Sequence, residues 1–116
     1  MLEKYPGERV AFYIDCTALL GATEAITGTP TVETYPKFTG GAALTVENPT
    51  KNENQVVLSD GTTVQAGKMV SMMIGAGQSS TDVDSRIYSV VVTFNTNAGN
   101  TLVAKSLLSV LPVGPA

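Results

Sequence analysis

Hydrophobic and polar residues alternate most regularly in the last third of the chain. Residues 86–96 form a β-branched and aromatic run, residues 97–100 form a polar segment with a glycine, and residues 101–110 form a second run. A strand, a glycine-bearing turn and a second strand predict an antiparallel β-hairpin. Its first strand should face the core with Tyr88, Val90, Val92 and Phe94.

Shorter runs of the same kind precede this hairpin. Strand-like segments, separated by turn residues, lie at 10–15, 43–47 and 68–74. Residues 24–35 are expected to form two short strand pieces, because Gly28 and Pro30 interrupt them, and the proline favours a sheet edge or a bulge.

Two polar segments in the middle of the chain predict turns. Residues 48–54 contain a proline and are expected to form an exposed loop. Asp60 and Gly61 lie between two β-runs within residues 55–64, and this dipeptide favours a tight hairpin turn with positive φ at both positions.

The whole pattern predicts an all-β fold. About seven short strands with turns every ~8–12 residues are typical of an immunoglobulin-like antiparallel β-sandwich. The 116 residues are expected to form a single domain. We expect an extended N-terminal arm at 1–9 and an extended C-terminal tail at 111–116, since both contain proline and glycine.

The charge content narrows the class of partner. Charged residues make up 15% of the chain, below the usual ~25%, so either a partner covers part of the surface or uncharged polar residues solvate it. The net charge is −3, and the seven basic residues are scattered. Nucleic acid is therefore not an expected partner.

For enzyme chemistry the chain offers lysines and carboxylates, but no two of them are placed together on one predicted element, and it has no histidine. The absence of histidine excludes an imidazole base and the usual catalytic triads, and no enzyme activity or cofactor is expected. Cys16 is the only cysteine and is expected to be a buried small hydrophobic residue. Asp15, at the end of a strand, is expected to accept a hydrogen bond from a backbone amide.

Two short motifs have weak binding signals. The glycines at 75 and 77 are expected to form a turn, because no helix follows that could complete a phosphate site. Asp82 and Asp84 lie in a polar loop and are expected to be solvated or to cap a hairpin, with a structural cation as the alternative. No metal site is therefore predicted.

No membrane-spanning segment is expected, because the apolar runs are only a few residues long. The polar N-terminal residues do not form a signal peptide. The chain is expected to be made in a cytoplasm and to remain soluble.

Exposed aromatic residues and the two ends of the chain are the candidate contact surfaces. Tyr5, Tyr35 and Phe38 lie in or beside the arm and the loops, where they suit a protein interface or cover one end of the sandwich. The predicted interface residues are Tyr5, Pro6, Tyr35, Phe38, Asp82, Asp84, Pro112 and Val113.

The order of several segments resembles the phage fiber–tail adaptor family, a group of small immunoglobulin-like virion structural proteins. These segments are the Tyr-Pro-Gly-Glu run at 5–8, the Phe-Tyr-Ile-Asp-Cys-Thr-Ala-Leu-Leu-Gly run at 12–21, the Glu-Ala-Ile-Thr-Gly run at 24–28, Thr31 and Val32, and the hairpin segment at 88–101. The resemblance implies a non-enzymatic protein, present in multiple copies in a symmetric virion assembly.

The resemblance leaves three functions open. The first is an adaptor that links fibers or spikes to a phage tail. The second is a capsid cement or decoration protein, and the third is a sandwich that binds a carbohydrate or another ligand. In the first two, the partners are tail, fiber or capsid subunits.

Overall fold

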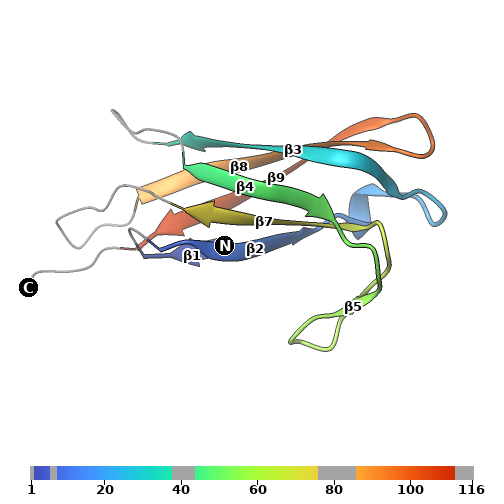
Figure 1. Cartoon of the computed structure of the whole chain (residues 1–116), viewed down its shortest axis with the longest axis horizontal. Coiled ribbons are helices and arrows are strands. Elements are labelled where there is room, and N and C mark those ends of the chain that lie inside the picture. Colours follow the sequence, from blue (N-terminus) through green and yellow to red (C-terminus); the bar gives the residue numbers. More distant parts are fainter. Residues whose placement is uncertain (1, 6–7, 38–43, 76–85, 112–116) are drawn as a thin grey trace, which may run out of the picture.

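The computed structural model describes residues 2–5, 8–37, 44–75 and 86–111 (Figure 1). Within these ranges the chain is almost entirely β-structure, as the sequence predicts. The elements are β1 (Leu2–Lys4), β2 (Val10–Asp15), the 3-10 helix η1 (Thr17–Leu19), β3 (Ile26–Pro36), β4 (Thr45–Lys51), β5 (Val56–Val57), β6 (Thr63–Val64), β7 (Met69–Gly75), β8 (Arg86–Thr96) and β9 (Thr101–Val110).

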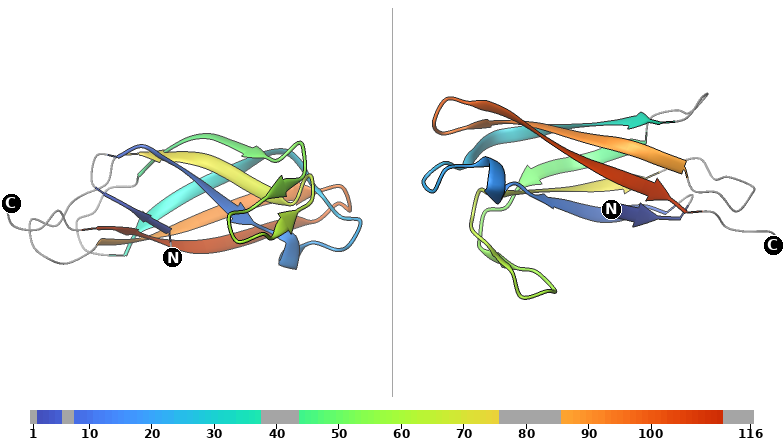
Figure 2. Two further views of the ribbon diagram at one scale, coloured as in Figure 1. Left: turned by 90° about the horizontal axis from the view of Figure 1, so that it is seen from below. Right: turned by 180° about the vertical axis from the view of Figure 1, so that it is seen from behind.

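Seven of these strands form the two layers of a sandwich (Figures 1 and 2). One sheet has the order β1-β9-β8-β3 and the other has the order β2-β7-β4. With β2, β3, β4, β7, β8 and β9 as strands B to G, this is the immunoglobulin arrangement of B-E-D against C-F-G. The predicted fold class is confirmed, except that β1 pairs with β9 in parallel.

The core lies between the two sheets and is made by alternate residues of the long strands. Tyr88, Val90 and Val92 of β8 have no exposed surface, and Phe94 is 2% exposed, as the alternation predicts. The buried cluster comprises Phe12, Cys16, Leu20, Ile26, Leu44, Val70, Met72, Ile74, Tyr88, Val90, Val92, Phe94, Ala104, Leu108 and Val110.

The predicted hairpin of β8 and β9 is confirmed residue by residue. Its strands pair in continuous register from Arg86 opposite Val110 to Asn95 opposite Thr101. Gly99 has a φ of 83°, a left-handed conformation that glycine adopts without steric cost. The amide of Gly99 donates to the carbonyl of Thr96 at 3.0 Å, which closes the turn.

The expectation of an extended arm at 1–9 is wrong for residues 2–4. These residues form β1 at the edge of the four-stranded sheet, with Leu2 opposite Leu108 and Lys4 opposite Val110. The Lys4 side chain is only 2% exposed, and its Nζ donates to the carbonyl of Tyr5 at 2.7 Å. Burial lowers the pKa of Lys4, while Glu8 opposes this effect. The alternation of apolar residues does not reveal this strand, because an inward-facing lysine interrupts its apolar face.

The expected break at Gly28 and Pro30 is a bulge within one strand. β3 is continuous, and its register with β8 shifts between Thr27 and Thr31. Gly28 has a φ of 69°, which accommodates the extra residues. The expectation of two strand pieces is therefore wrong, whereas the expectation of an edge strand with a bulge is confirmed.

The predicted loop at 48–54 is partly strand. β4 continues to Lys51, because a bulge between Glu47 and Thr50 absorbs one extra residue. Asn48 takes the left-handed conformation in this bulge, with a φ of 51°. Asparagine tolerates that conformation better than most other residues.

The Asp60-Gly61 hairpin exists, but its turn is wider than predicted. The Leu58 amide donates to the carbonyl of Thr62 at 2.8 Å, so three residues lie in the loop. Only Gly61 has a positive φ, of 88°. Asp60 instead accepts a hydrogen bond from the Thr62 amide at 2.8 Å, a side-chain bond that fixes the turn.

We predict that two neighbouring leucines of β9 differ sharply in their effect on stability. Leu108 is fully buried and Leu107 is 37% exposed. Leu108→Ala should lower the free energy of unfolding by about 2–5 kcal/mol, and the control Leu107→Ala by about 0.5 kcal/mol or less. Urea unfolding measures both, and equal losses would contradict the register of β9.

Candidate interaction surfaces

The structure describes two of the eight predicted interface residues. Tyr5 is 50% exposed and follows β1, whereas Tyr35 is 49% exposed and belongs to β3. These strands are the opposite edges of the four-stranded sheet, so the two tyrosines do not form one surface. The other predicted interface residues lie outside the described residues: Pro6, Phe38, Asp82, Asp84, Pro112 and Val113.

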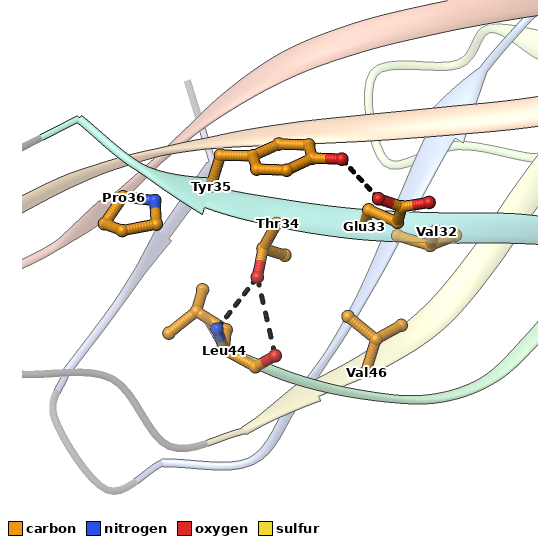
Figure 3. Close-up of a pocket in the computed structure, with 7 residues that line it drawn as sticks. All are labelled: Val32, Glu33, Thr34, Tyr35, Pro36, Leu44 and Val46. Atoms are coloured by element: carbon orange, nitrogen blue, oxygen red, sulfur yellow. Dashed lines mark hydrogen bonds between the residues drawn. The ribbon is translucent and has the colours of Figure 1, made fainter. Parts of the chain in front are cut away.

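Tyr35 borders a shallow groove of about 450 Å³ beside the edge of β3 (Figure 3). The groove is lined by Val32, Glu33, Thr34, Tyr35, Pro36, Leu44 and Val46. Thr34 points toward the chain leading into β4, and its Oγ1 accepts a hydrogen bond from the Leu44 amide at 2.8 Å. On the other side of the strand, the Tyr35 hydroxyl donates to Glu33, which raises the pKa of Tyr35. The lining is thus mainly apolar, and the Tyr35–Glu33 pair lies across the strand from the Thr34–Leu44 contact.

The open edge of β3 is poorly suited to long strand addition. The Lys37 amide donates to the carbonyl of Ile87 on β8 at 2.9 Å, so alternation turns the amides of Val32 and Thr34 away from the sheet. Pro36 lacks an amide hydrogen at the next outward position. Only a short stretch of this edge can therefore donate to another strand.

The outer face of the four-stranded sheet carries exposed apolar side chains. Tyr35, Val103 and Leu107 are 49%, 48% and 37% exposed. The register places Tyr35 and Leu107 on either side of Ser89, whereas Val103 lies opposite Thr93. All three side chains therefore share one face of the sheet. In the right-hand panel of Figure 2, strands β8 and β9 of this sheet lie toward the viewer.

The hairpin of β5 and β6 forms a separate two-stranded sheet that projects from one end of the sandwich (Figure 1). Val57 on this hairpin is 64% exposed. Asn52 holds its base: Nδ2 donates to the carbonyl of Gln65 at 2.9 Å, and Oδ1 accepts from the amides of Lys68 and Met69 at 3.0 Å each. The root of the hairpin is therefore anchored while its tip extends into solvent.

A polar cluster, here called the Glu24 network, joins two turns at one end of the sandwich. Glu24 accepts hydrogen bonds from the Thr96 hydroxyl at 2.6 Å, the Asn100 side chain at 2.8 Å and the Gly21 amide at 3.0 Å. Asn97 completes the network by accepting a hydrogen bond from the Ala25 amide at 3.0 Å. The bond from Thr96, then those from Gly21 and Asn100, lower the pKa of Glu24. The carboxylate is engaged in holding the turns together.

The remaining candidate chemistry is structural. Cys16 is 1% exposed, as predicted, and burial followed by the Asp15 charge raises the pKa of its thiol to about 11. Asp15 accepts a hydrogen bond from the Thr17 amide at 2.9 Å, which confirms the predicted role. Among the residues that the structure describes, no group of three or more acidic, cysteine or histidine residues is placed to hold a metal ion. No helix in the described ranges is long and apolar enough to cross a membrane.

Sequence patterns alone did not single out Glu24, Asn52 or the outer sheet face. Glu24 bonds to Thr96 and Asn52 bonds to Gln65, and both partners are distant in the sequence. No local pattern therefore identifies the role of Glu24 or Asn52. Within β9, the spacing of Val103 and Leu107 indicates that both lie on one face of the strand. Which residues of β3 share that face depends on the register of three strands.

Comparison with known proteins gives no relative for this chain. No protein-family model, no curated protein and no solved structure matches it.

We predict that the Cys16 thiol does not react in the folded protein. With a pKa of about 11 and 1% exposure, almost no accessible thiolate exists at pH 8. A thiol reagent should modify the native protein very slowly and the guanidinium-unfolded protein rapidly at one site. Rapid stoichiometric labelling of the native protein would contradict this burial.

We predict that the Glu24 network makes stability depend on acidity. Folding lowers the pKa of Glu24, so its contribution is present above the unfolded-state pKa and is lost as the pH falls through the folded-state pKa. Glu24→Gln should lower Tm at neutral pH, and the difference from wild type should shrink in acid. Glu53→Gln, an exposed carboxylate outside the network, is the control. A difference in Tm that does not change with pH would show that the charge of Glu24 does not contribute to stability.

Proposed function

We propose that this chain is a non-enzymatic structural protein that works by contacting other proteins, with a phage fiber–tail adaptor as its role. The virion assignment comes from the sequence resemblance. The observation that supports the interaction role is that exposed apolar side chains occur on two different parts of the fold: the projecting β5–β6 hairpin and the outer sheet face. A protein that links two others needs two such surfaces.

The hairpin supports this role through its physical character. A two-stranded hairpin is marginally stable by itself, and exposing a valine on it gains nothing for the isolated chain. A partner that covers Val57 would bury its 64% exposed side chain, which favours association. Capsid decoration would use the same features against a head lattice.

The groove beside β3 favours a second candidate, a ligand-binding module. Its lining combines apolar side chains with the aromatic ring of Tyr35 and the carboxylate of Glu33, the kinds of group that ligand sites use. Saturable binding on a glycan array that is lost in Tyr35→Ala would favour this candidate.

We predict that the protein is found in purified virus particles and lies at the tail. Mass spectrometry should detect it there, and a particle map should show its sandwich around the tail axis. Density spread over the capsid would replace the adaptor role with decoration. Absence from particles would contradict both virion roles.

A hairpin variant tests the contact itself. Val57→Asp should leave the fold intact, because the side chain is exposed, but should reduce incorporation into particles severalfold. Ala18→Asp, an exposed residue beside the sandwich in η1, is the matched control. Normal incorporation of Val57→Asp would show that the hairpin is not a contact.

A further inference from the structure

The outer face of the four-stranded sheet has a pattern of side chains that is complementary to itself. Three rows cross β3, β8 and β9 in register: Tyr35–Ser89–Leu107, Glu33–Val91–Lys105 and Thr31–Thr93–Val103. In the middle row an acidic and a basic residue lie on either side of Val91. In the first row an aromatic and an aliphatic residue lie on either side of Ser89.

Glu33 and Lys105 do not pair with each other within one chain. Their strands are separated by β8, so the two residues lie about 10 Å apart across the sheet. Glu33 instead accepts a hydrogen bond from the Tyr35 hydroxyl, which lies on the same face. The side chains of Glu33 and Lys105 are both exposed, so both charges are presented outward from the same face.

We propose that two copies of this chain associate through this face around a twofold axis that runs along β8. Such an axis exchanges the two sides of β8, so Glu33 of each copy meets Lys105 of the other. The same operation places Tyr35 over Leu107 and Thr31 over Val103. Two ion pairs then flank a contact between the two Val91 side chains. The inference rests on the proposed interaction role, for which it names one partner.

The charges select this axis over the alternative. A twofold axis that crosses the strands at Val91 would place Glu33 over Glu33 and Lys105 over Lys105, and like charges in contact repel. Both axes keep the strands of the two sheets nearly aligned, which is the common way for sheets to pack face to face, so the charges alone decide between them. The axis along β8 makes an isologous interface, in which one patch serves both copies.

The size of the face limits the strength of the dimer. Three long strands at a spacing of ~4.8 Å and roughly ten residues each cover about 500 Å². This is below the ~800 Å² per partner of a standard stable interface. The dimer should therefore form at high protein concentration and dissociate on dilution, unless a larger assembly holds the copies together.

Charge reversal with the full chain tests this arrangement. Sedimentation over a range of concentrations should show reversible dimerisation of the wild type. Glu33→Lys and Lys105→Glu should each weaken it about tenfold or more, because each turns two attractive contacts into two repulsive ones. Glu53→Lys, an exposed residue on the connection between β4 and β5, is the control and should dimerise like the wild type. Thermal unfolding monitors that every variant is folded.

Combinations that restore opposite charges test whether Glu33 of one copy contacts Lys105 of the other. The two single variants mixed together should form a heterodimer, and the double variant Glu33→Lys/Lys105→Glu should dimerise like the wild type. Monomers at every concentration, or single variants that dimerise normally, would overturn the inference. Dimerisation that is lost in the single variants but restored in neither combination would also overturn this axis. The location in particles tests the adaptor role independently of this dimer.

Discussion

The register between β8 and β9 is the constraint on which the rest of the structure depends. It fixes which face of each strand points inward, so that Tyr88, Val90 and Leu108 are fully buried. A shift of one residue would turn these side chains outward and bring their polar neighbours into the core. The same register places Lys105 and Leu107 on the outer face. Core and contact surface are thus two consequences of one pairing.

The ends of the sandwich are held by polar groups. The Glu24 network ties the turn after β8 to the connection before β3, and Asn52 ties the root of the β5–β6 hairpin to the chain before β7. These bonds satisfy backbone groups that strand pairing leaves open at the turns. They fix the geometry of the loops without offering reactive groups, since the Glu24 carboxylate is already occupied and Cys16 is buried. The proposed contacts therefore rest on exposed apolar side chains such as Val57 and Leu107.

Sequence patterns predict those elements whose strands and turn lie in one continuous segment of the chain. β8 and β9 were predicted at their observed ends because their alternation and turn lie within one continuous segment. β1 was not predicted, since its three residues gain their pairing from β9 at the far end of the chain. The bulge at Asn48 was missed for a similar reason, because it exists only relative to the register of β7.

The candidate surfaces were predictable to a smaller extent. Tyr35 was identified as an exposed aromatic residue, but its groove and its alignment with Leu107 arise from strands that are distant in the sequence. Glu33 and Lys105 form a complementary pair only through the register that places Val91 between them. Contact surfaces of a sheet depend on cross-strand neighbours, and a single sequence specifies these only through the complete topology.

The most direct test of this account is the β8–β9 register measured in solution by NMR. The account predicts backbone contacts between Val91 and Lys105 and between Tyr88 and Leu108. Contacts displaced by one residue, such as Val91 with Ala104, would contradict it, because both the core and the outer face would then be assigned to the wrong side chains.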